Sequence, residues 1–182
     1  MKYMVISDIH GSRTAVEKAL MHFDNLKCDF LIVLGDILYH GPRNPLPEGH
    51  DPKGAAMLLN SVANRIIAIR GNCDAEVDQM VLDFPCMSET AVVADNGIRY
   101  FATHGQMYNE KALPRFNGYD VMLFGHTHLW MLEEKDEVLC CNPGSIALPK
   151  EGRPATFALI EDGQVSVRTL HEGEILALYK VN

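Results

Sequence analysis

The stretch KYMVISDIHG, residues 2–11, decides the fold, because an apolar run that predicts a buried β-strand ends directly in Asp8 and His10. Residues 30–36, FLIVLGD, repeat this arrangement, and the second apolar run ends at Asp36. The carboxyl ends of parallel strands meet at one edge of a sheet. We therefore expect these polar side chains to gather at a common edge.

The segment between the two runs predicts a helix. Its apolar residues recur at helical spacing and are Val16, Ala19, Leu20 and Phe23. Ser12 is the expected N-cap of this helix. A second helix is expected at residues 52–62, followed by a strand at 65–70. Strand-helix-strand units join parallel strands, so the sheet is expected to begin parallel.

The second half of the chain reads mostly as hairpins. DNG at 95–97 and EDG at 161–163 match the tight turns that strand twist favours. Strands that should form or extend a second sheet are expected at residues 120–124, 130–134, 138–141, 156–160 and 164–170. The pattern predicts an α/β fold, a four-layer α/β/β/α sandwich of two mixed sheets flanked by helices, in a single domain over residues 1–182.

Five short polar clusters that follow strand-like runs carry the candidate chemistry. They are Asp8-Ile9-His10, Gly35-Asp36, Gly71-Asn72-Cys73-Asp74, Thr103-His104-Gly105 and Gly125-His126-Thr127-His128. Seven nitrogen and oxygen ligands without a thiolate cluster suit two divalent ions such as Mn, Fe, Zn, Ni or Co. A carboxylate such as Asp36 can bridge two ions about 3.5 to 4 Å apart, which activates water for attack on phosphorus.

These five ordered clusters resemble the signature of the calcineurin-like metallophosphoesterase superfamily. With the segment HGPRN at 40–44, the chain is most similar to compact bacterial phosphodiesterases of the YfcE type, over essentially its whole length. The resemblance implies one metal held by Asp8, His10, Asp36 and His128, and another held by Asp36, Asn72, His104 and His126. It also implies Mn²⁺ as the metal, with Ni²⁺, Fe²⁺, Zn²⁺, Co²⁺ or Mg²⁺ as alternatives, and catalytic roles for Asn72 and His104.

Further residues near the clusters are candidates for catalysis or substrate binding. Cys73 stands where the superfamily usually has a His that protonates the leaving oxygen, and a thiol with an ordinary pKa of about 8.5 is a poorer acid. Asp74 could orient a water molecule or cap the following turn. Arg43 could grip phosphate oxygens through two hydrogen bonds, and His40 is either a substrate contact or a solvated loop residue.

The remaining histidines and one tyrosine have simpler interpretations. His22, His50 and His171 are assigned to structural or surface positions. Tyr39 lies three residues after Asp36, where purple acid phosphatases carry an iron-binding tyrosinate. The rest of that pattern is incomplete, so ordinary packing of the ring is the favoured interpretation.

Composition narrows the class of protein. The formal charge of −8 opposes binding of nucleic-acid polymers but is compatible with small phosphorylated substrates. No apolar run reaches about 18 residues, so no membrane span is expected, and the first run is too short for a signal peptide. Five cysteines without Cys-x-x-Cys spacing predict reduced thiols and a cytoplasmic protein. A homodimer is left open.

The expected function is hydrolysis of small phosphodiesters by a hydroxide that bridges the two metals and attacks phosphorus in line. The preference for diesters comes from the resemblance, and a phosphomonoesterase of the same fold is the nearest alternative. A scaffold like the retromer subunit of similar fold fits less well. All seven ligand positions are intact here, and burying them together is costly without ions.

Overall fold

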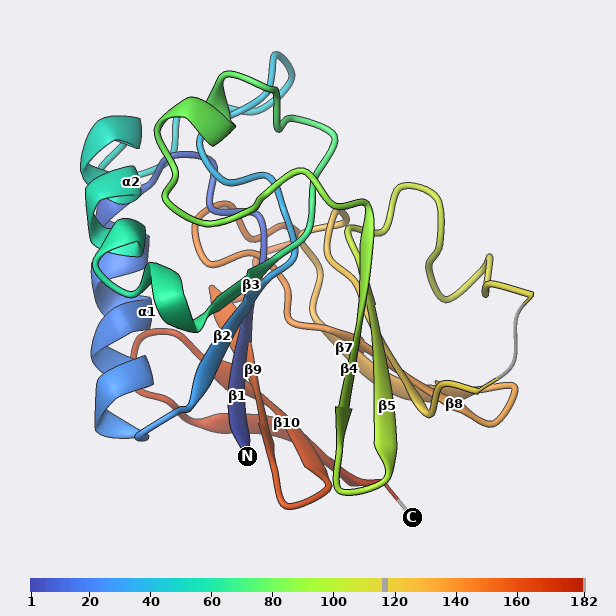
Figure 1. The fold of residues 1–182 in the computed structure, drawn as a ribbon. Helices are drawn as coiled ribbons and strands as arrows, with labels where there is room; N and C mark the ends of the chain where they lie inside the picture. The colour runs from blue at the N-terminus through green and yellow to red at the C-terminus, as the bar shows by residue number, and fades with distance from the viewer. Residues whose placement is uncertain (116–117, 182) are drawn as a thin grey trace.

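Two β-sheets packed face to face form the centre of the computed structural model, which describes residues 1–115 and 118–181 (Figure 1). In the first sheet the described strands follow the order β11 (Ile175–Lys180), β10 (Gln164–Thr169), β9 (Thr156–Glu161), β1 (Lys2–Ile6), β2 (Phe30–Val33) and β3 (Ile66–Ala68). In the second the order is β4 (Thr90–Asp95), β5 (Ile98–Thr103), β6 (Val121–Leu123), β8 (Val138–Asn142) and β7 (Met131–Lys135).

Two helices, α1 (Arg13–Asn25) and α2 (Pro52–Asn60), cover the outer face of the first sheet (Figure 1). The predicted cap of α1 is confirmed, because the Ser12 hydroxyl accepts a hydrogen bond from the Ala15 N–H at 3.2 Å. Short 3₁₀ turns follow at Ala63–Arg65 and Asp78–Met80. Among the described helices, none has the length and apolar character needed to cross a membrane.

The predicted strand-helix-strand units and both hairpins are confirmed. β1 pairs parallel with β2, and β2 pairs parallel with β3. The turn at residues 95–97 joins β4 to β5, and the turn at 161–163 joins β9 to β10, with antiparallel pairing in both cases. The two mixed sheets of the predicted fold are therefore present.

The sheet assignment of β9 and β10 was wrong. They do not join the second sheet but extend the first, where β9 runs antiparallel to β1. The reason is burial on both faces: Phe157 packs with the residues under the helices, whereas Ala158 and Ile160 pack between the sheets. The sequence also missed β11, and it read as hairpins a region in which β5, β6 and β8 pair in parallel.

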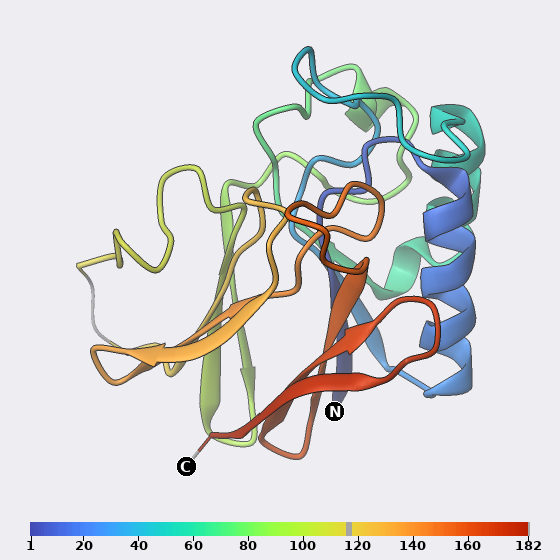
Figure 2. The same ribbon diagram turned by 180° about the vertical axis from the view of Figure 1, so that it is seen from behind.

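The outer face of the second sheet is covered by a loop. Tyr108, Leu113 and Tyr119, which follow β5, pack there against Phe101 and Met122. Within residues 1–115 and 118–181 the helices lie on the opposite side of the molecule (Figure 2). The expected fourth layer is thus a loop in the described structure rather than a helix.

Candidate metal centre

All seven predicted ligands meet at one edge of the two sheets, each in a loop that leaves the carboxyl end of a strand. Asp8 and His10 follow β1, Asp36 follows β2, Asn72 follows β3, His104 follows β5, and His126 and His128 follow β6. The structure therefore brings together side chains that are up to 120 residues apart in the sequence.

Five of these ligands adopt a backbone conformation that L-residues seldom take. The φ angles are positive at Asp8 (55°), His10 (50°), Asp36 (55°), His126 (69°) and His128 (63°). Such a conformation costs on the order of 1–3 kcal/mol per residue and is retained where the surrounding structure enforces it, as at active sites. In this conformation the side chains point into the site. Hydrogen bonds between the loop after β1 and the loop after β2 help to stabilise it.

Close contact between loops depends on Gly125. A Cβ atom at this position would lie 1.9 Å from the Ser7 hydroxyl and 2.8 Å from Asp8 Oδ2. The neighbouring His126 N–H donates to the same Asp8 oxygen at 3.0 Å. The glycine thereby lets the loop after β6 lie directly against the loop after β1.

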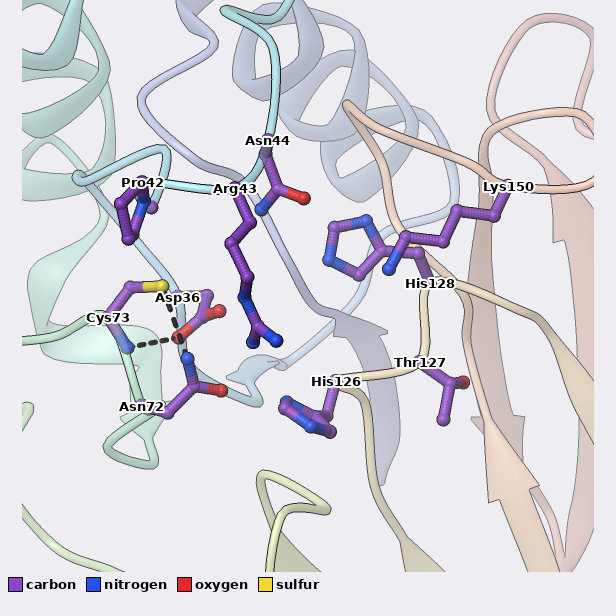
Figure 3. Close-up of a pocket in the computed structure, with 11 residues that line it drawn as sticks. Asp36, Pro42, Arg43, Asn44, Asn72, Cys73, His126, Thr127, His128 and Lys150 are labelled. Carbon is purple, nitrogen blue, oxygen red and sulfur yellow. Dashed lines mark hydrogen bonds between the residues drawn. The ribbon is translucent and has the colours of Figure 1, made fainter.

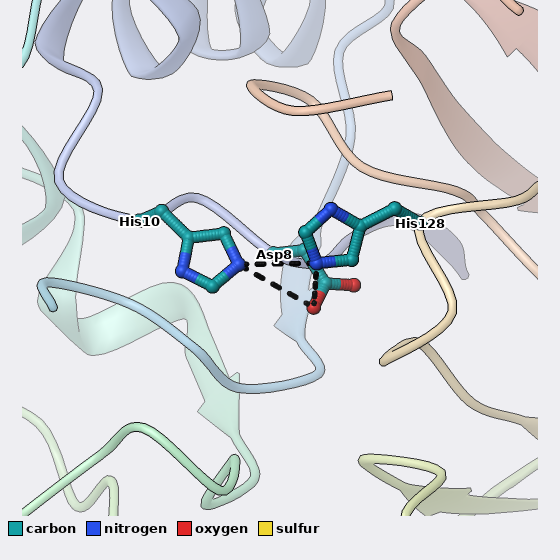
Figure 4. A group of neighbouring side chains, drawn as sticks. All are labelled: Asp8, His10 and His128. Carbon is teal, nitrogen blue, oxygen red and sulfur yellow. Dashed lines mark hydrogen bonds and ion pairs between the residues drawn. The ribbon is translucent and has the colours of Figure 1, made fainter. Parts of the chain in front are cut away.

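The inner ligand group, which we define as Asp8, His10 and His128, is buried (Figure 4). The Nε2 atoms of the two imidazoles are 3.2 Å apart, and Asp8 Oδ1 lies 3.4 Å from His128 Nε2 and 3.9 Å from His10 Nε2. This Asp8 oxygen has no hydrogen-bond partner within the described residues. A buried carboxylate oxygen without a donor, facing two imidazole nitrogens, fits a divalent cation.

Main-chain carbonyl groups fix three of the imidazole rings. The Nδ1–H groups donate to carbonyl oxygens as follows: His10 to Tyr39 at 2.9 Å, His104 to Leu34 at 2.6 Å, and His128 to Leu148 at 2.6 Å. This bond orients each ring and leaves Nε2 as the free lone-pair donor. All three Nε2 atoms face the cluster, as metal ligation requires.

The outer ligand group, which we define as His104, Asn72 and His126, adjoins the inner one through Asp36. Asp36 Oδ2 lies 3.7 Å from His10 Nε2, and Asp36 Oδ1 lies 3.5 Å from His104 Nε2. His104 Nε2 is also 3.1 Å from Asn72 Oδ1, and the rings of His104 and His126 are 5.2 Å apart. Asp36 thus offers one oxygen to each group, the arrangement of a bridging carboxylate.

Electrostatic coupling keeps the shared carboxylate ionised. Burial favours its neutral form, but the hydrogen bond and charge of His104 outweigh burial and lower the pKa of Asp36 to about 2. Burial likewise opposes the charged form of His104, yet the hydrogen bond to Asp36 and the charges of Asp8 and Asp36 raise its pKa to about 9. Burial lowers the pKa of His126 and of His128.

Asp74, for which the sequence left open the orientation of a water molecule or the capping of the following turn, binds the backbone of two loops. Its buried carboxylate accepts three main-chain N–H bonds, from Asp36 at 2.8 Å and from Ile37 and Gly71 at 2.7 Å each. Both oxygens are therefore engaged by the backbone. Asp74 is a positioning residue that ties the loop of Asp36 to the loop of Asn72.

A cavity of about 480 Å³ opens over the outer ligand group (Figure 3). Its lining includes the ligands Asp36, Asn72, His126 and His128, the thiol of Cys73, and two cationic side chains, Arg43 and Lys150. Arg43, which the sequence suggested as a contact to phosphate oxygens, is therefore placed at the cavity beside the ligands. Lys150 was missed, because a lysine 22 residues after His128 carries no recognisable spacing signal.

Two residues of the loop after β2 lie elsewhere. His40 is not among the residues that line the cavity, and its ring packs against Tyr39 and His50, with centroids 4.9 and 5.5 Å away. The Tyr39 side chain is 46% exposed, which argues against a tyrosinate ligand. The expected substrate contact of His40 is therefore not supported. His22 and His171, like His50, lie outside the cavity lining.

Cys73 lies at the cavity wall next to the shared carboxylate. Its N–H donates to Asp36 Oδ1 at 2.8 Å, and its sulfur accepts from Asn72 Nδ2 at 3.3 Å. Burial, followed by the charge of Asp36, raises the pKa of the thiol to about 12. The thiol is thus well placed beside the site but is a weak proton donor.

Comparisons with known proteins agree with this geometry. Residues 1–163 match the family model described as the calcineurin-like phosphoesterase superfamily domain. The chain is 44% identical to phosphodiesterase YfcE of Escherichia coli strain K12, over 100% of this chain and 99% of that protein. The solved structure of E. coli YfcE superposes with a TM-score of 0.96 and covers 100% of both chains.

More distant relatives extend the comparison. Phosphodiesterase MJ0936 of Methanocaldococcus jannaschii is 27% identical over 79% of this chain and 83% of that protein. A Vps29 variant from Entamoeba histolytica, at 19% identity with a TM-score of 0.62 and full coverage of both chains, shares the fold. The family match and the full-length identity confirm the resemblance drawn from the five clusters: the chain belongs to the calcineurin-like phosphoesterase superfamily.

Proposed function

We propose that this protein is a phosphodiesterase that depends on two divalent metal ions and hydrolyses small phosphodiesters. The observation that carries the proposal is the position of Asp36, which offers one carboxylate oxygen to each of two ligand groups at the floor of an open cavity. The full-length similarity to a protein named as a phosphodiesterase supports the choice of reaction.

The residues at the cavity have separate expected roles in metal binding, phosphate binding and proton donation. When bound, the two ions would lower the pKa of a water molecule and offset negative charge on phosphorus. His104 and Asn72 would hold one ion at the cavity floor, and the Arg43 guanidinium can donate two hydrogen bonds to phosphate oxygens in a bidentate manner. Cys73 lines the cavity where the superfamily usually has a histidine, and because a thiol is a poorer acid than an imidazolium, we expect the departing alcohol to leave largely unassisted.

The cavity also bears on the size and charge of the substrate. Its volume of about 480 Å³ is in the range that small ligands occupy, and the charge of −8 opposes nucleic-acid polymers. Arg43 and Lys150 together would also suit the extra charge of a phosphomonoester, so monoester hydrolysis is the second candidate. Mn²⁺ as the metal, a homodimer and a cytoplasmic location stay predictions.

Hydrolysis assays on metal-stripped protein test the proposal. The protein is reconstituted with Mn²⁺, Ni²⁺, Fe²⁺, Zn²⁺, Co²⁺ or Mg²⁺ and supplied with bis-p-nitrophenyl phosphate or p-nitrophenyl phosphate. We expect metal-dependent hydrolysis of the diester and its loss in Asn72→Ala and His104→Ala, but not in the exposed control Asp83→Asn. Full turnover by either ligand variant at limiting metal would contradict the proposal, and a strong preference for the monoester would favour the second candidate.

A further inference from the structure

Two cationic side chains enter the cavity from opposite loops. Arg43 comes from the loop between β2 and α2, and Lys150 comes from the loop between β8 and β9 (Figure 3). Within the described parts of the chain, neither makes a hydrogen bond or an ion pair through its side chain. In a protein with a net charge of −8, two cations left available at the same cavity favour anion binding.

The backbone around Lys150 is fixed. The Lys150 carbonyl accepts from the Arg153 N–H at 3.1 Å, and the positive φ angles of Glu151 (55°) and Gly152 (67°) form the tight turn between them. Arg153 is turned away, because its guanidinium donates to the Trp130 carbonyl at 2.8 Å and lies over the Trp130 ring. Of the two cations in this turn, only Lys150 lines the cavity.

The two cations occupy different places in the cavity. The Arg43 guanidinium lies over the middle of the site between Asp36 and His126, whereas Lys150 lies to one side, beside His128 (Figure 3). Arg43 is therefore suited to the central phosphate, and Lys150 to a group farther out.

The charge balance indicates what that outer group is. Two divalent ions held by Asp8 and Asp36 would leave two positive charges that these carboxylates do not neutralise, and a singly charged diester and a hydroxide would offset them. Arg43 and Lys150 add two further positive charges, which a simple diester leaves uncompensated. Building on the proposed function, we propose that Lys150 binds a second, non-scissile anionic group on one ester arm, so that the preferred substrates are phosphodiesters with this additional negative charge.

A matched pair of substrates tests this inference. The p-nitrophenyl ester of thymidine 5′-monophosphate and its 3′-phosphorylated form share the scissile bond and leaving group. We expect the wild type to show a kcat/KM about tenfold higher for the phosphorylated compound at low salt, mainly through KM, because a charge-assisted contact contributes this order of affinity. Lys150→Ala should abolish this preference, Lys150→Arg should restore it, and Lys53→Ala, which removes an exposed lysine of α2, should leave it unchanged.

The outcomes separate the two proposals. Equal use of the two diesters by the wild type, or a Lys150→Ala variant that keeps the preference, would overturn the role of Lys150 while leaving diester hydrolysis established. A Lys150→Ala defect as large with p-nitrophenyl phosphate as with the phosphorylated diester would also overturn it, because it would place Lys150 on the scissile phosphate. Failure to hydrolyse either diester with every metal would overturn both proposals.

Discussion

The inner and outer ligand groups differ in how the fold prepares them. Asp8, His10 and His128 are at most 4% exposed, and both imidazoles are fixed by main-chain carbonyls. In the outer group only His104 is buried and fixed in this way, whereas Asn72 is exposed and His126 is half-buried at the cavity wall. Folding alone therefore prepares the inner group, whereas two members of the outer group, Asn72 and His126, line the open cavity.

This difference has a clear origin in the loops. The inner group comes from the loops after β1 and β6, which lie in contact at Gly125. The outer group depends on the loop after β3, and a side chain that is not a ligand, Asp74, ties that loop to Asp36. We expect the inner group to bind its ion more tightly, with the outer ion and the substrate sharing the open side.

Removing the shared carboxylate should have the largest effect, because it takes one ligand from both groups. We expect Asp36→Ala to reduce kcat/KM for bis-p-nitrophenyl phosphate by at least ~10³-fold, since both charge stabilisation and water activation depend on paired ions. Elemental analysis should show a loss of bound metal. Asp83→Asn serves as the control, and two tightly held ions in Asp36→Ala would contradict the bridging role.

Metal affinity should depend on pH differently at the inner and outer ligand groups. An imidazole must be neutral to bind a metal, and Asp36 holds the pKa of His104 at about 9, whereas the pKa of His128 is lowered by burial. Because the metal competes with a bound proton on His104, affinity at the outer group should rise about tenfold per pH unit from neutral pH and level off near pH 9. Calorimetry in buffers of different ionisation enthalpy measures the released proton, and an affinity independent of pH would refute this assignment.

Loss of the hydrogen bonds that Asp74 accepts from the backbone should weaken metal binding at the outer group more than at the inner group. Asp74→Asn places an amide against main-chain donors, which we expect to cost about 1–3 kcal/mol in the free energy of unfolding. Urea denaturation of the metal-free protein measures this cost, and metal titration should show weakened binding of one ion. Asp78→Asn, at another buried carboxylate that accepts the Ala75 N–H, is the matched control that should keep both ions.

The smallest expected effect on activity comes from changing the proton donor at the cavity wall, Cys73. Cys73→His should raise turnover of diesters with poor leaving groups by about tenfold or more, because a histidine can protonate the departing oxygen. Activated aryl esters should change little, so the dependence of rate on leaving-group pKa becomes shallower. Cys73→Ser supplies the control without an acid, and an unchanged dependence in Cys73→His would contradict the proposed lack of a general acid in this protein.

Much of the site could be predicted from the sequence, because its ligands are tied to strand ends. Asp8, Asp36 and His104 each follow an apolar run, and parallel strands deliver their carboxyl ends to one edge. The sheet position of β9 and β10 could not be predicted in this way, since the continuous apolar run of β9 and the alternating apolar residues of β10 fit either sheet. Packing beneath the helices, a long-range effect, decided it.

The sequence by itself determined which residue types stand at the strand ends, because hydrophobic periodicity and cluster order are local properties of the chain. Only the tertiary structure decided which ligands are buried, which oxygen of Asp36 faces which group, and that Asp74 serves the backbone rather than the substrate. It also decided that Lys150 reaches the cavity. These features depend on contacts between loops far apart in sequence, where burial and hydrogen bonding are set by how the two sheets pack together.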